Sequence, residues 1–307
     1  AETFSWEGTV LASSASIFWG LVAVMVKLSP SLSTSKLIFH FSLGIFVGVT
    51  TCQSGVPVLY GPLSAQRKLV VHSVLATSSI FARFFCLRYL SLMNSYALGN
   101  VGPALTLIPE YLFKGPEVLT FSRLFAVAMM GVGVCLIIHT NLSEVAEESA
   151  AHNFSVGCGL ALTSAFLRAV QREFSSLDAD IPSVMRLFHW SFLALLTSCA
   201  VAIWNGDIGQ IFGDSDMGAL VFLSQVSFAF VYFVSKARES GDYGVVNMCL
   251  YSGDLVLAIV ASLVYLREDT RPLSYVAAVM VLASVFCAEL SKRKAASLRQ
   301  RAGLQRV

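Results

Sequence analysis

The sequence predicts an all-α membrane protein with ten transmembrane helices. Of its 307 residues, 56% are hydrophobic and only 13% are charged, whereas soluble domains have roughly 25% charged residues. The apolar residues occur in runs of about 17 to 24, and a helix of that length crosses a hydrocarbon core of about 30 Å. A soluble fold could not cover so much apolar surface, so the bilayer is the expected solvent.

Ten apolar windows appear when the chain is divided at charges, prolines and glycine clusters. We expect the first of them to be a true span and not a removed signal peptide, because no small-residue cleavage site follows it. Most connections are short, so consecutive helices should run antiparallel. The predicted helices cover residues 8–28, 35–56, 69–91, 94–114, 117–140, 154–175, 182–204, 217–237, 243–265 and 272–290.

The distribution of basic residues predicts the orientation. If the amino terminus is cytoplasmic, fifteen of the 21 Lys and Arg residues lie on the inner side, five lie on the outer side, and Arg83 stays within the third span. Cytoplasmic segments of membrane proteins are enriched in Lys and Arg, so we expect both termini inside. The outer segments 141–153 and 205–216 agree, because they contain acidic residues and no Lys or Arg.

The two halves of the chain resemble each other. The segment GTVLASSASIFWG from Gly8 is echoed by GCGLALTSAFLRA from Gly157. A unit with an odd number of helices re-enters the membrane from the opposite side, so its second copy is inverted, as alternating access requires. We therefore expect two inverted five-helix repeats, over residues 1–141 and 154–290, and a basic cytoplasmic tail over 291–307.

Further motifs extend the likeness to a known family. The opening at Gly8, the turn at residues 113–120 and the Gly-rich stretch 130–134 resemble the tandem EamA-type repeats of the drug/metabolite transporter superfamily. The resemblance covers residues 8–290 and points to the branch of solute carriers related to nucleotide-sugar transporters. It implies ten helices around a central cavity, with the third, fourth, eighth and ninth near the path. The chain lacks a GALNK-type segment of the kind found in GDP-mannose carriers, so the motifs do not support nucleotide-sugar transport.

Charged residues inside the expected spans are the first candidates for a functional site. A charge at a helix centre costs about 2.5 to 3.5 kcal/mol on insertion scales, so it must face protein, water or a partner. Arg83, Arg168 and Asp254 meet this description, while Glu110 and Arg172 lie nearer the cytoplasmic ends. The alternative is that each charge pairs with a neighbouring helix and only fixes the packing.

Helix-breaking residues lie near the same depth. Gly253 precedes Asp254 and leaves room for another group to approach, and in the first half Gly99 and Gly102 thin the fourth helix. Pro103 permits a kink and frees the carbonyl of Gly99. We expect a solute pocket between the fourth and ninth helices. Four residues near it could donate hydrogen bonds or simply pack the helices: Tyr96, Asn100, Asn247 and Tyr251.

Two mechanisms remain open at this stage. Asp254 could take up a proton and couple transport to a proton gradient. Alternatively, Arg83 and Arg168 could hold an anionic substrate in an antiporter that exchanges two anions.

The sequence therefore predicts a secondary transporter of a small polar or anionic metabolite that works by alternating access. The alternative is a non-transporting membrane subunit of a larger complex that retains the fold. No catalytic motif or metal-ligand spacing occurs, so we expect no enzyme activity, no cofactor, no metal site and no nucleic-acid partner. The expected partners are the solute and the bilayer. The Gly44–Gly48 pair could bring helices together in a homodimer, although packing within the chain is the default.

Overall fold

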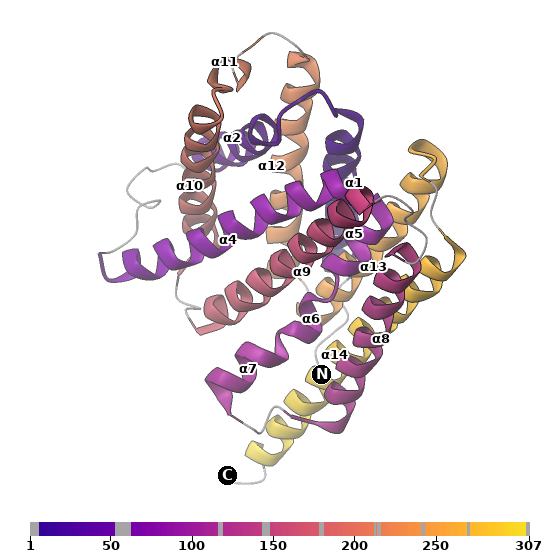
Figure 1. Ribbon diagram of the computed structural model, residues 1–307. Helices are drawn as coiled ribbons and strands as arrows, with labels where there is room; N and C mark the ends of the chain where they lie inside the picture. The colour runs from indigo at the N-terminus through magenta and orange to yellow at the C-terminus, as the bar shows by residue number, and fades with distance from the viewer. Residues whose placement is uncertain are drawn as a thin grey trace.

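A computed structural model describes residues 6–52, 63–115, 119–142, 148–177, 181–211, 213, 216–240, 243–268 and 271–304. This part of the chain is helical and contains no strand (Figure 1). Nine of its helices are long and apolar enough to cross a membrane. The expectation of an all-helical, multi-pass membrane protein is confirmed at this level.

The helices of the first half follow the predicted windows closely, except in the fourth. They are α1 (Trp6–Leu28), α2 (Thr34–Cys52), α4 (Leu63–Tyr89), α5 (Leu92–Gly99), α6 (Gly102–Leu105), α7 (Leu107–Lys114) and α8 (Phe121–Leu142).

The second half contains five long helices and two short elements. The helices are α9 (Glu148–Leu177), α10 (Ser183–Trp204), α11 (Ile208–Ile211), α12 (Met217–Ser240), α13 (Tyr243–Val260) and α14 (Pro272–Leu304), and a π-helical turn, η2 (Ala261–Tyr265), extends α13.

The fourth window is where the structure departs most from the prediction. In place of one helix over residues 94–114, the chain forms α5, α6 and α7 in succession. The amide of Asn100 still bonds to the carbonyl of Tyr96, whereas the next α-helical bond is donated by Leu105 to Val101. Pro103 has no N–H to donate, and the two glycines that precede it, Gly99 and Gly102, cost backbone entropy, so the ladder is interrupted here.

The last helix is longer than expected. It continues from the apolar window through the predicted tail as far as Leu304. Residues 291–302 include no Gly or Pro and are rich in good helix formers, so nothing local ends the helix earlier.

The long helices pack as neighbours that are distant in sequence. In Figure 1, α4 lies beside α9 and α8 lies beside α14, while α1 packs against α12 and α13 and α2 packs against α10 and α12. Ser79 of α4 and Ser164 of α9 exchange hydrogen bonds, each hydroxyl donating to the other residue's carbonyl at 3.1 and 2.9 Å. Such hydroxyl pairs join helices where water is absent.

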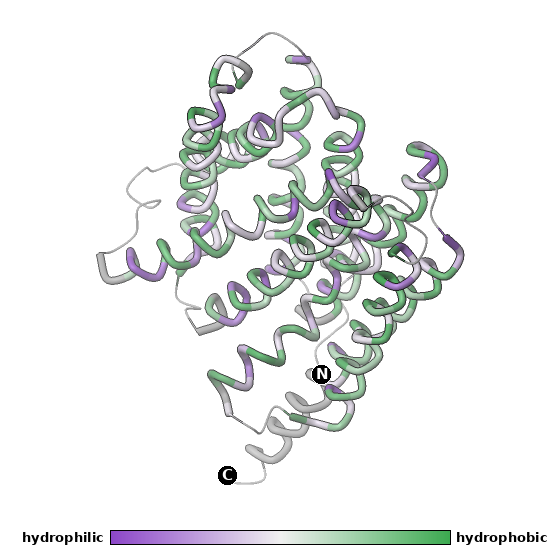
Figure 2. Tube along the Cα trace, viewed as in Figure 1, coloured by the Kyte–Doolittle hydropathy of each residue, from purple (hydrophilic) through white to green (hydrophobic). Residues whose placement is uncertain are grey.

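Apolar side chains cover the outside of this bundle as well as its core. Figure 2 shows hydrophobic residues along most of each long helix. The core includes Trp19, whose ring meets those of Phe41 and Phe230 at centroid distances of 5.9 and 5.0 Å. At helix ends, Trp6 and Trp204 are 73% and 90% exposed, which fits the aromatic belts found at membrane surfaces.

The Gly44–Gly48 pair packs within the chain. A side chain on Gly44 would overlap the backbone of Ser224, and one on Gly48 would overlap the ring of Phe228. Both contacts are with α12. The pair therefore lets α2 and α12 approach closely, and it is not free to form a dimer contact.

Gly44→Ala should destabilise the protein by about 1 to 3 kcal/mol, because the added methyl group forces α2 away from the α12 backbone. The measurement is thermal unfolding of the purified protein in detergent. Gly131→Ala is the matched control, since no atom lies within 4 Å of a side chain added there. An unchanged melting temperature for Gly44→Ala would contradict the close packing.

Candidate functional site

Arg83 is enclosed by the broken fourth segment. Its side chain is only 2% exposed. One guanidinium nitrogen donates a 2.6 Å hydrogen bond to the carbonyl of Ser95, and Cζ lies 4.5 Å from the ring centroid of Tyr96. A side chain on Gly99 would overlap the same guanidinium. The role of Gly99 is therefore to make room for Arg83, which ties α4 to α5.

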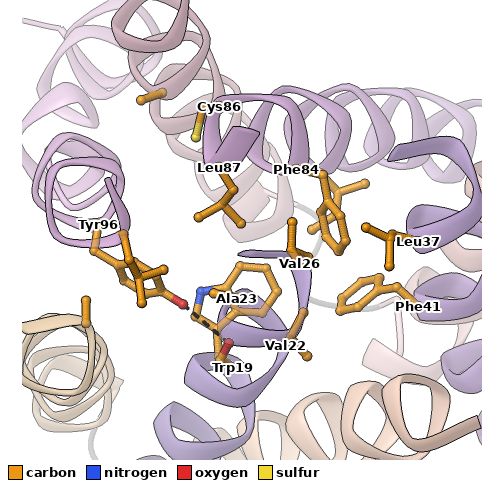
Figure 3. Packing of buried hydrophobic residues seen from close by; sticks show 14 of the residues in the cluster. Trp19, Val22, Ala23, Val26, Leu37, Phe41, Phe84, Cys86, Leu87 and Tyr96 are labelled. Carbon is orange, nitrogen blue, oxygen red and sulfur yellow. Dashed lines mark hydrogen bonds between the residues drawn. The ribbon is translucent and has the colours of Figure 1, made fainter. Parts of the chain in front are cut away.

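Tyr96 and Asn100 join the same broken segment to other helices. The Tyr96 hydroxyl donates to the carbonyl of Trp19 in α1 at 3.3 Å (Figure 3). The side-chain amide of Asn100 donates to the carbonyl of Tyr251 in α13 at 3.1 Å. These two bonds hold the α5–α6 break between α1 and α13.

Arg168 differs from Arg83 in its surroundings. It lies on α9 and is half-buried, and its Cζ lies 5.7 Å from the ring centroid of Trp19. No hydrogen bond or ion pair joins its guanidinium to any residue that the structure describes. A cation–π contact can orient an arginine, but it leaves the N–H donors of the guanidinium unused.

Asp254 lies at the middle of α13, facing these arginines. The hydroxyl of Ser16 from α1 lies near its carboxylate, but the hydrogen-bond acceptors of this hydroxyl are the carbonyls of Leu250 at 3.1 Å and Ala12 at 3.3 Å. A side chain on Gly253 would come within 2.7 Å of the same hydroxyl. The helix is not broken at Gly253, contrary to expectation. The glycine instead lets α1 approach α13.

The charges of this cluster are close enough to interact but are not paired. Asp254 experiences the charges of Arg168 and Arg83, yet no ion pair of 4.0 Å or less joins them in the described part of the chain. Its Oδ1 atom is buried and has no hydrogen-bond partner there. Buried polar atoms nearly always have partners, so this unfilled acceptor beside an unused guanidinium makes the cluster the candidate site.

The remaining candidate residues are less directly connected with this cluster of charges. Asn247 shares the α13 face of Tyr251 and Asp254, at i, i+4 and i+7, and is 3% exposed. Gly102 faces the carbonyl of Ala165, 3.6 Å from the position of an added side chain. Pro103 lines a small pocket with Glu110.

The charges nearer the predicted cytoplasmic ends are paired. Glu110 accepts a 2.6 Å hydrogen bond from Arg123 of α8, and Arg172 lies 3.2 Å from Glu289 of α14. These pairs link helices and support a packing role. Among the described residues, no group of His, Cys, Asp and Glu side chains could hold a metal ion.

One end of the bundle, which we call the Lys27 end, is closed by a polar network. Glu268 pairs with Lys27 of α1 at 3.3 Å. It also accepts hydrogen bonds from the Leu92 amide at 2.7 Å and the Ser262 hydroxyl at 2.8 Å. Lys27 donates to the carbonyl of Leu90 as well. The α4–α5 turn is thereby tied to α1 and to the connection after η2.

Sequence reasoning missed Ser16 and Trp19. A sequence signal for Trp19 did exist, because aligning Gly8 with Gly157 pairs Trp19 with Arg168. The two side chains that contact each other in the structure therefore hold equivalent positions in the echoed segments. No feature of the sequence distinguishes Ser16 from the other serines of α1.

Comparisons with known proteins concern the fold alone. No family model matches the chain, and no curated relative matches it. Of solved structures, 26 chains match. One, described only as a crystal structure of a protein, has a TM-score of 0.62 at 18% identity and covers 95% of this chain and 98% of its own. An experimentally observed fold thus extends over nearly the whole chain, and a shared fold does not establish a function.

Gly99→Ala should destabilise the protein by about 1 to 3 kcal/mol, because the methyl group displaces the Arg83 guanidinium from its bond to Ser95. Gly102→Ala, three residues along, is the matched control. The nearest atom to its added carbon is the carbonyl oxygen of Ala165, at an ordinary contact distance of 3.6 Å. Thermal unfolding in detergent compares the two. Equal melting temperatures would show that Arg83 does not depend on Gly99.

Glu268→Gln should loosen the Lys27 end. Hydrogen bonds to charged groups contribute about 1.5 to 3 kcal/mol, so amide exchange at Leu92 and Met93 should quicken on the order of tenfold. Hydrogen exchange read by mass spectrometry checks this. Glu239→Gln removes an ion pair whose Glu239 side chain is 55% exposed and should leave that exchange unchanged. Identical protection in both variants would mean that Glu268 does not hold this end.

Proposed function

We propose that this protein is a secondary transporter of a small polar or anionic metabolite, working by alternating access in the manner of the drug/metabolite transporter superfamily. The observation that supports this most directly is the unpaired state of Arg168 beside Asp254. Both groups are half-buried, and both keep hydrogen-bonding capacity that no described residue uses. A solute with complementary groups would fill that capacity.

The same observation favours transport over a purely structural role. A non-transporting subunit would have its interior charges paired and sealed, as Glu110 and Glu289 are. An unpaired interior charge destabilises a folded protein. Its presence is explained when a ligand completes the pair for part of the working cycle.

The pattern of helix contacts supports two inverted repeats. If α1, α4 and α8 are matched with α9, α12 and α14, the α1–α12 contact becomes the α9–α4 contact, and the α8–α14 contact maps onto itself. The Trp19–Arg168 contact also joins equivalent positions. The segment α5–α7 serves as the tenth crossing in this proposal, so both termini lie on one side of the membrane, and the distribution of Lys and Arg assigns that side to the cytoplasm.

The network at the Lys27 end supports alternating access. An alternating carrier must close one face while the other opens. Here Glu268 and Lys27 join three parts of the chain at one face, and each bond in the network can break without unfolding a helix. In the proposed orientation this is the outer face.

Purified protein in proteoliposomes should take up a solute from a panel of nucleotide sugars, organic acids, amino acids and nucleotides. Arg168→Gln should reduce that uptake at least about tenfold, because truncating one member of a buried charge contact costs 2 kcal/mol or more. Arg67→Gln is the control, since Arg67 is exposed on α4 and should transport normally.

Two results would contradict the proposal. One is the lack of uptake of every solute in the panel by correctly folded protein. The other is normal uptake by Arg168→Gln, which would place the solute elsewhere.

A further inference from the structure

We infer that the transported solute is a zwitterion with no net charge, whose anionic group binds Arg168 and whose cationic group binds Asp254. This inference rests on the proposed transport function and narrows its substrate class. It is based on Arg168 and Asp254, two interior charges for which the described part of the chain supplies neither an ion pair nor a hydrogen bond.

Arg83 is not available to a solute. Its guanidinium donates to Ser95, stacks on Tyr96 and is enclosed by the backbone of Gly99. Among its other donors, Nε is buried and has no partner among the described residues, and the whole side chain is only 2% exposed. A second anionic group would need this arginine, so the site holds one such group.

Arg168 is the cation that remains. The face of Trp19 positions its guanidinium from one side, and the planar fork of N–H donors is left to bind a carboxylate or a similar oxyanion in a bidentate manner. Other interior charges are occupied. Lys36 donates to the carbonyl of Gly213 at 3.3 Å, and Glu289 pairs with Arg172.

Asp254 sets the other end of the solute. The nearby Ser16 hydroxyl reaches the carbonyl of Leu250, and Oδ1 of Asp254 is a buried acceptor without a hydrogen-bond partner among the described residues. A solute with two negative charges would bring like charges together at this oxygen, which is costly in a medium of low dielectric constant. An ammonium group supplies both the opposite charge and N–H donors.

The test uses the full-length protein in proteoliposomes. The probes are radiolabelled amino acids with uncharged side chains and glycine betaine, and then, for the amino acid taken up best, its N-acetyl derivative and its amide. These derivatives remove the cationic and the anionic group in turn. Inorganic phosphate and succinate serve as dianionic probes. Each derivative should compete with uptake of the parent zwitterion at least about tenfold more weakly than the parent itself.

Two variants assign the groups. In Asp254→Asn, the N-acetyl derivative should compete nearly as well as the parent, because the variant no longer selects a cationic group. In Arg168→Gln, the amide derivative should compete nearly as well as the parent, because the variant no longer selects an anionic group. If these two residues acted only in folding, each substitution would weaken all competitors equally. The order of the competitors would then stay the same.

The outcomes separate this inference from the proposed function. Uptake of phosphate or succinate in preference to every zwitterion would overturn the inference and leave transport intact. Uptake of a zwitterion with unchanged selectivity in both variants would overturn the assignment of its groups. No uptake of any probe or of the wider metabolite panel would overturn both.

Discussion

A charge inside a membrane protein must be balanced within the protein, and this requirement divides the interior of the bundle into two kinds of site. Arg83 is balanced by the carbonyl of Ser95 and the ring of Tyr96, so it stabilises the broken fourth segment. Arg168 contacts the face of Trp19, and in the described part of the chain neither its guanidinium nor the carboxylate of Asp254 has a hydrogen bond or ion pair. The proposed function depends on this difference between the two arginines. A desolvated and unpaired charge is costly, and a ligand that pairs with it would explain its presence.

The backbone break positions these groups. Because the α-helical ladder stops after Asn100, the side-chain amide of Asn100 reaches the carbonyl of Tyr251 while the Tyr96 hydroxyl reaches α1. Both bonds hold the break against the two helices that present Ser16 and Asp254. The polar network at the Lys27 end uses the first residue of the same segment, through the amide of Leu92. The break therefore connects the interior charges to the end of the bundle that would open and close in the proposed transport cycle.

Hydropathy alone was enough to predict most of the fold, because a span of about twenty apolar residues has few alternatives in a bilayer. Nine helices appear close to the predicted windows. The break in the fourth was signalled by Gly99, Gly102 and Pro103, although its division into three helices was not predicted. The cluster of Arg83, Arg168 and Asp254 was found because interior charges are rare. The sequence did not predict which of the two arginines is held by other groups of the protein. Arg83 is held by the carbonyl of Ser95 and the ring of Tyr96, which only the fold brings close to it.

The most direct test compares the stability of two charge-removing variants without any solute. Arg83→Gln should lower the melting temperature in detergent by several degrees, because it leaves the Ser95 carbonyl without its donor. Arg168→Gln should melt at the wild-type temperature or above it, because it removes a half-buried charge that no described residue pairs. Equal destabilisation by both substitutions would show that Arg168 is also a packing residue, and the binding site proposed around it would be contradicted.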